Sequence, residues 1–174
     1  MKTMEWTNVD RTGWPSGQWD GEPDKVQWQD QATGYPCLAV RHRFSGHWCG
    51  YVGVQVGHPA YEKGYDEVAV KNEDGEDTYP DVHGELTFAD RCQPGEDHGK
   101  GVCHLPEPGE SDSVWWLGFD CAHCDDYGPR DAVYARDRSE ECFSLSYRRS
   151  YRTLDYVKSQ CAGLAKQLHG AANG

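Results

Sequence analysis

The chain has 174 residues, and 29 acidic against 17 basic side chains give it a formal net charge of -12 at pH 7. A chain of this length can bury enough surface to fold around one core, so we expect a single domain over residues 1–174. The negative charge repels nucleic-acid backbones and anionic membrane surfaces, which excludes both as expected partners.

The apolar patterning favours a cytoplasmic protein. No stretch reaches the roughly 20 apolar residues that a membrane helix needs, and the first residues lack the apolar core of a signal peptide. In the cytoplasm we expect the eight cysteines to stay reduced and to act as core residues, metal ligands or reactive thiols.

The first half of the chain contains three predicted structural segments. Residues 1–35 carry four tryptophans among Gly, Pro and Asp with no strand or helix period, which predicts an irregular segment wrapped on the body. Residues 37–44 and 49–56 are rich in β-branched residues around a short Gly-containing loop, which predicts a hairpin. Residues 81–88 alternate apolar and polar side chains, which predicts a further strand.

The second half contains a central strand and a helix. Residues 114–120 (VWWLGFD) have bulky apolar side chains on both faces, which predicts an internal strand. Thr153 is a suitable N-cap for a helix over residues 151–169. Its apolar positions follow helical spacing: Leu154, Val157, Cys161, Leu164 and Leu168. The predicted fold is α+β, a mostly antiparallel sheet with long irregular loops over residues 36–150 and one long C-terminal helix.

The segment CAHC has the spacing of half a zinc knuckle. Four cysteines form the candidate zinc ligands: Cys92, Cys103, Cys121 and Cys124. A strong zinc signature needs a second closely spaced pair of cysteines, but ten residues separate Cys92 from Cys103. A redox pair is disfavoured for two reasons. In CAHCDDYGPR the cysteines are followed by Gly-Pro and not by the start of a helix, and the acidic neighbours raise the pKa of a thiol.

Three segments carry a candidate ligand site: the GHPAY loop, the polar side of VHGELT and the turn after FDCAH. Histidines and carboxylates that converge in this way can bind a divalent metal, perform acid–base chemistry or hydrogen-bond a polar ligand. Gly118 within a strong strand marks a close approach, and Trp116 beside it offers a stacking surface. The candidate site residues are His58, Tyr61, His83, Glu85, Trp116, Asp120, His123 and Asp126. Each histidine taken alone is more typical of a surface residue or a satisfied core residue.

In this order, the segments GHPAY, VHGELT, WWLGFDCAH and the C-terminal helix resemble a family of uncharacterised proteins encoded by tailed bacteriophages and prophages. The resemblance covers about residues 48–168 and implies an accessory viral protein in the bacterial host cytoplasm. The family pattern reads H-G-G-L-T where this chain has Glu85, and it has a small residue in place of Cys124. The positions that match the pattern are His58, Pro59, Tyr61, His83, Gly84, Asp120, Cys121, His123 and Asp126.

Three functions remain open on this sequence. The first is a binding protein that captures a small polar, nucleotide-like ligand, such as a host immune signal, with help from Arg41, Arg43 or Lys63. The second is a metal-dependent hydrolase of such a ligand that uses the histidines and carboxylates above. The third is an acidic inhibitor that docks on a host protein.

Overall fold

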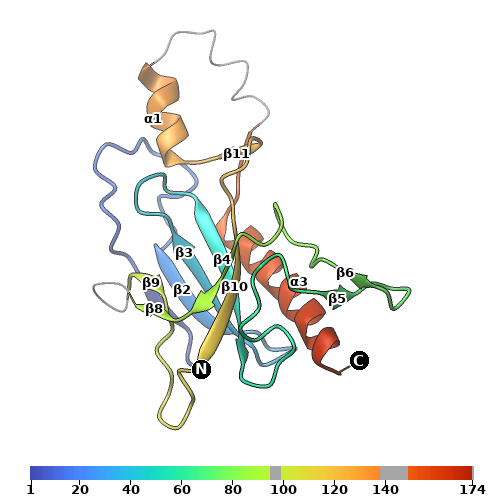
Figure 1. The fold of residues 1–174 in the computed structure, drawn as a ribbon. Coiled ribbons are helices and arrows are strands. Elements are labelled where there is room, and N and C mark those ends of the chain that lie inside the picture. Colours follow the sequence, from blue (N-terminus) through green and yellow to red (C-terminus); the bar gives the residue numbers. More distant parts are fainter. Residues whose placement is uncertain (95–98, 138–148, 174) are drawn as a thin grey trace.

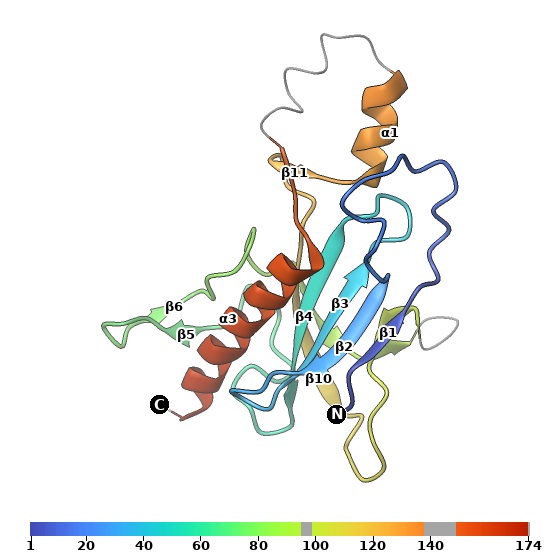
Figure 2. The same cartoon turned by 180° about the vertical axis from the view of Figure 1, so that it is seen from behind.

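The computed structural model describes residues 1–94, 99–137 and 149–173. They form a six-stranded antiparallel sheet, in the order β1-β2-β3-β4-β10-β7, and a long helix, α3 (Leu154–Asn173), that packs against it (Figures 1 and 2). The strands are β1 (Met4–Trp6), β2 (Lys25–Gln29), β3 (Pro36–Arg41), β4 (Trp48–Gln55), β10 (Val114–Asp120) and β7 (Phe88–Arg91). The predicted α+β fold is therefore confirmed.

The remaining elements are short and lie at the margins of the sheet (Figure 1). Two antiparallel pairs of short strands and one parallel pair connect segments of the long loops. A short helix comes directly after the first strand of the parallel pair. These elements are β5 (Val70–Lys71) with β6 (Asp77–Thr78), β8 (Gln93–Pro94) with β9 (Gly101–Val102), β11 (Asp126–Tyr127) with β12 (Ser150–Tyr151), and α1 (Pro129–Asp137). Within the described ranges, no helix has both the length and the apolar character of a membrane span.

Helix α3 covers one face of the sheet, and the core lies between them (Figure 2). The helix buries one stripe at helical spacing: Val157, Cys161, Leu164 and Leu168. The sheet presents the alternate residues of its central strands: Val52, Val54, Leu117 and Phe119. The helix begins after Thr153, whose hydroxyl accepts a hydrogen bond from the Tyr156 backbone N–H at 3.3 Å, as an N-cap does. It continues to Asn173, four residues beyond the predicted end.

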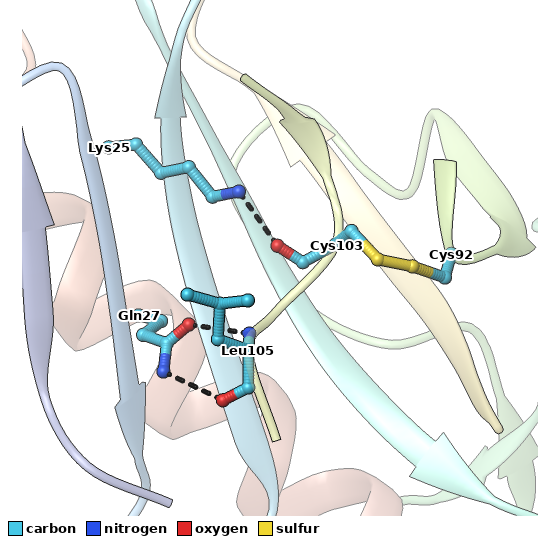
Figure 3. The surroundings of a disulfide bond; sticks show 5 residues. All are labelled: Lys25, Gln27, Cys92, Cys103 and Leu105. Carbon is cyan, nitrogen blue, oxygen red and sulfur yellow. Dashed lines mark hydrogen bonds between the residues drawn. A yellow bond between two sulfur atoms is a disulfide. The ribbon is translucent and has the colours of Figure 1, made fainter. Parts of the chain in front are cut away.

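The opposite face of the sheet is covered by the chain around Cys103–Leu105 (Figure 3). The Gln27 amide both accepts from the Leu105 N–H at 2.9 Å and donates to the Leu105 carbonyl at 3.2 Å. The Lys25 ammonium donates to the Cys103 carbonyl at 2.7 Å. Side chains of β2 thus satisfy the backbone of a covering loop, which a buried loop requires. Strand β10 lies between β4 and β7 with both faces covered, as predicted.

Two expectations about local structure were wrong. The predicted irregular segment 1–35 contains β1 and β2, although its Trp19 does pack on the body against Tyr151. The predicted strand 81–88 is largely a turn, because Gly84 and Glu85 have φ values of 63° and 71°, and regular pairing begins only at β7. The predicted hairpin is present as β3 and β4.

Candidate functional site

The predicted pocket that joins His58 to the other histidines does not form. His58 Nε2 donates to the Leu168 carbonyl at 3.0 Å, and its Nδ1 accepts from the Ala60 N–H at 3.0 Å. His83 instead contacts Tyr156 of α3. Leu168 and Tyr156 are twelve residues apart, or about 18 Å along a helix. His58 therefore ties its loop to the end of α3 and has both ring nitrogens satisfied.

Tyr61 and Glu85 also lie apart from the histidine pair His83 and His123. Tyr61 packs near Trp115, with ring centroids 6.2 Å apart, beside a hollow of about 280 Å³. The Trp115 indole donates to the Lys63 carbonyl at 3.0 Å, which fixes this loop to β10. Glu85 is exposed in left-handed backbone. Neither residue contributes to a shared pocket.

Trp116 and Asp120 lie on the face of β10 that points away from α3. Trp116 is completely buried, with the His104 ring edge-on at 5.5 Å, so its indole is a core residue and not a stacking surface. Gly118 is required because a Cβ there would collide with the Tyr51 ring, so the close approach is internal packing. The Asp120 carboxylate accepts from the Thr87 hydroxyl at 3.0 Å. The sequence was therefore misleading about Trp116 and Gly118.

His83, His123 and Asp126 do come together. His83 Nε2 lies 2.8 Å from Asp126 Oδ2, and His123 Nδ1 lies 3.4 Å from the same oxygen. The ligand atoms of the three side chains all lie within 4.8 Å of one another. The two imidazole rings are edge-on, with centroids 5.2 Å apart. Three of the eight predicted site residues thus form one cluster.

Two tight turns position this cluster against α3. In the first turn, Gly84 is left-handed and lies so close to the His123 ring that a Cβ would collide with it. In the second, the Asp126 N–H donates to the His123 carbonyl at 3.0 Å, and Asp126 Oδ2 accepts from the His123 N–H at 2.9 Å. Tyr156 then fixes His83 through a 2.9 Å hydrogen bond between its hydroxyl and Nδ1. The ring positions are therefore set by backbone and helix together.

The Asp126 carboxylate is held in its charged form. Burial alone would raise its pKa, but hydrogen bonds from Arg152, from His83 and from the His123 backbone outweigh burial and lower the pKa overall. Arg152 Nε donates to Asp126 Oδ1 at 2.6 Å, while its terminal nitrogen reaches Asp125 at 2.7 Å. One Asp126 oxygen therefore faces a guanidinium and the other faces the two histidines.

The four candidate cysteine ligands are not a zinc site. Cys92 and Cys103 form a disulfide, with their Cα atoms 4.7 Å apart, that anchors the covering loop (Figure 3). Cys121 is buried, and its burial raises the thiol pKa, whereas Cys124 is exposed. Within the described ranges, no cysteine belongs to a group of three side chains placed to hold a metal. The expectation that all cysteines are reduced was wrong for this pair; Cys142 lies outside the described residues.

A larger cavity, of about 830 Å³, lies where the sequence indicated no site. It is bounded by the N-terminal segment 8–14, by the ends of β3 and β4 and by residues 99–101. Aromatic and cationic side chains form much of its wall: Trp14, Phe44, Tyr51, Arg41, His42, Arg43 and Lys100. The run RHRF at positions 41–44 was the available signal, because it places cationic and aromatic residues at a strand end.

Arg41 at the base of the cavity is part of a buried ionic network. Its guanidinium bonds Glu22 at 2.8 Å, lies 3.3 Å from Asp24 and sits over the Trp48 ring at 4.2 Å. Glu22 also accepts from the Tyr151 hydroxyl and the Trp48 indole. The guanidinium also donates to the Gly46 carbonyl and the Tyr151 hydroxyl, so Arg41 is a structural residue. Exposed Arg43, stacked on Phe44 at 4.3 Å, is the cation better placed for a ligand.

No family model, curated protein or solved structure matches this chain.

Proposed function

We propose that the protein binds a small polar ligand carrying an aromatic ring, of nucleotide-like chemistry, in the 830 Å³ cavity. The observation that carries the proposal is the composition of its wall: aromatic and cationic side chains meet there, in a chain with a net charge of -12. The volume lies in the range of about 300 to 1,000 Å³ that small-molecule sites occupy. The cationic side chains of the wall can bind a phosphate group, and the aromatic side chains can stack on a nucleotide base.

The pair Arg43 and Phe44 supports this ligand class. Phe44 is 60% exposed at the cavity rim, where its ring is accessible for stacking by the ring of a ligand. Arg43 stacks on Phe44, so a ligand that reaches one side chain also reaches the other. Asp10 and Asp24 on the same wall disfavour a ligand that is anionic along its whole length. A mixed ligand, with one charged end and one ring, fits this distribution.

The setting that we propose is the cytoplasm of a bacterial host, where a viral protein would sequester a nucleotide-derived defence signal. The resemblance to phage-encoded proteins supports the viral setting. Among the residues that the structure describes, five cysteines are free thiols, which supports a reducing compartment: Cys37, Cys49, Cys121, Cys124 and Cys161. The disulfide between Cys92 and Cys103 is the one feature that points the other way.

The test is to incubate the protein with cyclic nucleotides and ADP-ribose derivatives, with and without EDTA, then to denature it and chromatograph the released compounds. We expect one compound to be depleted from solution and recovered intact. Arg43→Ala and Phe44→Ala should weaken its binding at least tenfold, whereas Tyr79→Ala, which removes an equally exposed ring elsewhere, should not. If every compound stays free, or all three variants bind alike, the proposal fails. Conversion to product, abolished by EDTA, would instead indicate a metal-dependent enzyme.

A further inference from the structure

We propose that His83, His123 and Asp126 bind one divalent transition-metal ion through His83 Nε2, His123 Nδ1 and Asp126 Oδ2. These residues lie outside the walls of the 830 Å³ cavity, so this inference does not depend on the ligand proposed above. The set of two imidazoles and one carboxylate suits Zn²⁺ and other divalent first-row ions.

The three donor atoms lie close to coordination geometry. Ligands about 2.0 to 2.2 Å from a zinc ion are about 2.8 to 3.6 Å apart when the angle between them is between octahedral and tetrahedral. The observed separations from Asp126 Oδ2, 2.8 Å to His83 and 3.4 Å to His123, fall in this range. The two histidine nitrogens lie within 4.8 Å of each other and would draw together around a bound ion.

His123 supplies an independent reason to expect a ligand. Its Nδ1 atom is buried and has no hydrogen-bond partner, although it faces the Asp126 carboxylate. Buried polar atoms in proteins are nearly always paired, because an unpaired one loses its hydration without replacement. Gly84 lies close beside the ring, where a Cβ would collide with it, so the ring is confined on that side. A cation bound to this lone pair would satisfy the atom.

The groups behind the donors orient them as in known metal sites. Metal-bound histidines usually donate their other ring N–H to an oxygen, which fixes the tautomer. His83 Nε2 hydrogen-bonds Asp126 Oδ2 at 2.8 Å, so an ion would replace the proton on Nε2. With its remaining proton on Nδ1, His83 can donate to the Tyr156 hydroxyl 2.9 Å away and coordinate the ion through Nε2. Arg152 holds the second Asp126 oxygen at 2.6 Å and so directs Oδ2 toward the histidines.

The three ligand side chains differ in exposure. The Asp126 and His83 side chains are 2% and 9% exposed, whereas that of His123 is 34% exposed. An ion can therefore enter past His123, and a fourth position would remain for water. Three protein ligands with one open position are the arrangement of catalytic zinc sites, whereas structural zinc sites are closed by four.

Zinc binding to metal-free protein tests the site. After dialysis against EDTA and removal of the chelator, titration calorimetry with Zn²⁺ should show one ion per chain, and Co²⁺ should give the visible absorption of a four-coordinate ion. His123→Gln and Asp126→Asn should each weaken Zn²⁺ binding at least tenfold. His169→Gln, an exposed histidine on α3, is the matched control and should bind as the wild type does.

A further variant separates loss of the site from loss of the fold. Tyr156→Phe keeps the ring on α3 and removes only the hydroxyl, and we expect Zn²⁺ binding to weaken by about tenfold, the low end of the usual loss when the hydrogen bond behind a metal-bound histidine is removed. Circular dichroism of each metal-free variant should match the wild type. The proposal is overturned if Zn²⁺ does not bind, if His123→Gln binds it as tightly as the wild type, or if alkylation of the free thiols abolishes binding.

Discussion

Replacement of Arg41 by Met should destabilise the protein by about 3 to 5 kcal/mol, the usual cost of breaking a buried ion pair. The Arg41 side chain is fully buried, and the side chains of Glu22 and Asp24 are 15% and 1% exposed. Methionine fills similar volume but removes the guanidinium that pairs with Glu22, whereas Asp24 keeps its ion pair with Arg11. Because domains of this size are stable by about 5 to 15 kcal/mol, the loss is a large share of the total.

The measurement is urea denaturation at pH 7, followed by tryptophan fluorescence. Arg43→Met is the control, because Arg43 lies two residues away but is exposed, and it should change the free energy of unfolding by less than about 0.5 kcal/mol. If Arg41→Met costs less than about 1 kcal/mol, the carboxylates are not held by this guanidinium and the reasoning is refuted.

The same variant should show a distinctive pH dependence. Burial alone would raise the pKa of Glu22, but hydrogen bonds from the Leu154 N–H, Tyr151, Trp48 and Arg41 outweigh burial and lower the pKa overall. A carboxyl with a lowered pKa contributes stability that is complete above its ordinary pKa and is lost as the pH falls through the lowered one. Without Arg41 the Glu22 pKa rises, so the difference between variant and wild type should shrink as the pH falls below about 4.5. A constant difference down to pH 3 would contradict this account.

Three further predictions concern single contacts. Glu85→Gly should stabilise the protein by about 0.5 to 1 kcal/mol, because Glu85 has a φ of 71° that glycine adopts without strain; an unchanged or lower urea midpoint would contradict this. Replacement of both Cys92 and Cys103 by Ser should cost about 2 to 3 kcal/mol, from the eleven-residue separation that the disulfide closes, and reducing agent should then have no added effect on unfolding. Burial alone would raise the pKa of Asp126, but hydrogen bonds, including the one from Arg152, lower it overall. The ionised Asp126 side chain therefore stabilises the fold, and this stabilisation is lost as the pH falls through the lowered pKa. Asp126→Asn should reduce the acid dependence of stability measured between about pH 5 and 2.

Elements whose side chains repeat with a clear period were predictable from the sequence. The spacing of Val157, Cys161 and Leu164 defined α3, and alternation defined β4 and β10. Strand β2 was missed because Lys25 and Gln27 occupy inward positions, where they bond the backbone of the covering loop. The apolar side of β2 consists only of Val26 and Trp28, so this short alternation is easily taken as part of an irregular segment.

The candidate site was predictable only where its residues are held by local structure. His123 and Asp126 lie in one turn, and their proximity follows from a spacing of three residues. His83 joins them through the left-handed backbone at Gly84, which breaks the alternation that the sequence suggested. His58 was placed wrongly because its partner, the Leu168 carbonyl, is a backbone atom that no side-chain pattern reports. The large cavity was missed because three distant segments build it.

The cavity and the histidine cluster lie on opposite faces of the sheet, which limits the chemistry that they can share. The cavity wall includes Cys49 and Tyr51, whose side chains point away from α3, whereas His83 bonds Tyr156 on α3. A metal-bound water at the cluster therefore could not attack a ligand held in the cavity. Accordingly, Phe44→Ala should leave Zn²⁺ binding unchanged, and His123→Gln should leave ligand binding unchanged. If His123→Gln abolished both Zn²⁺ binding and ligand binding, the two sites would not be separated by the sheet. The metal and the ligand would then have to share one catalytic centre.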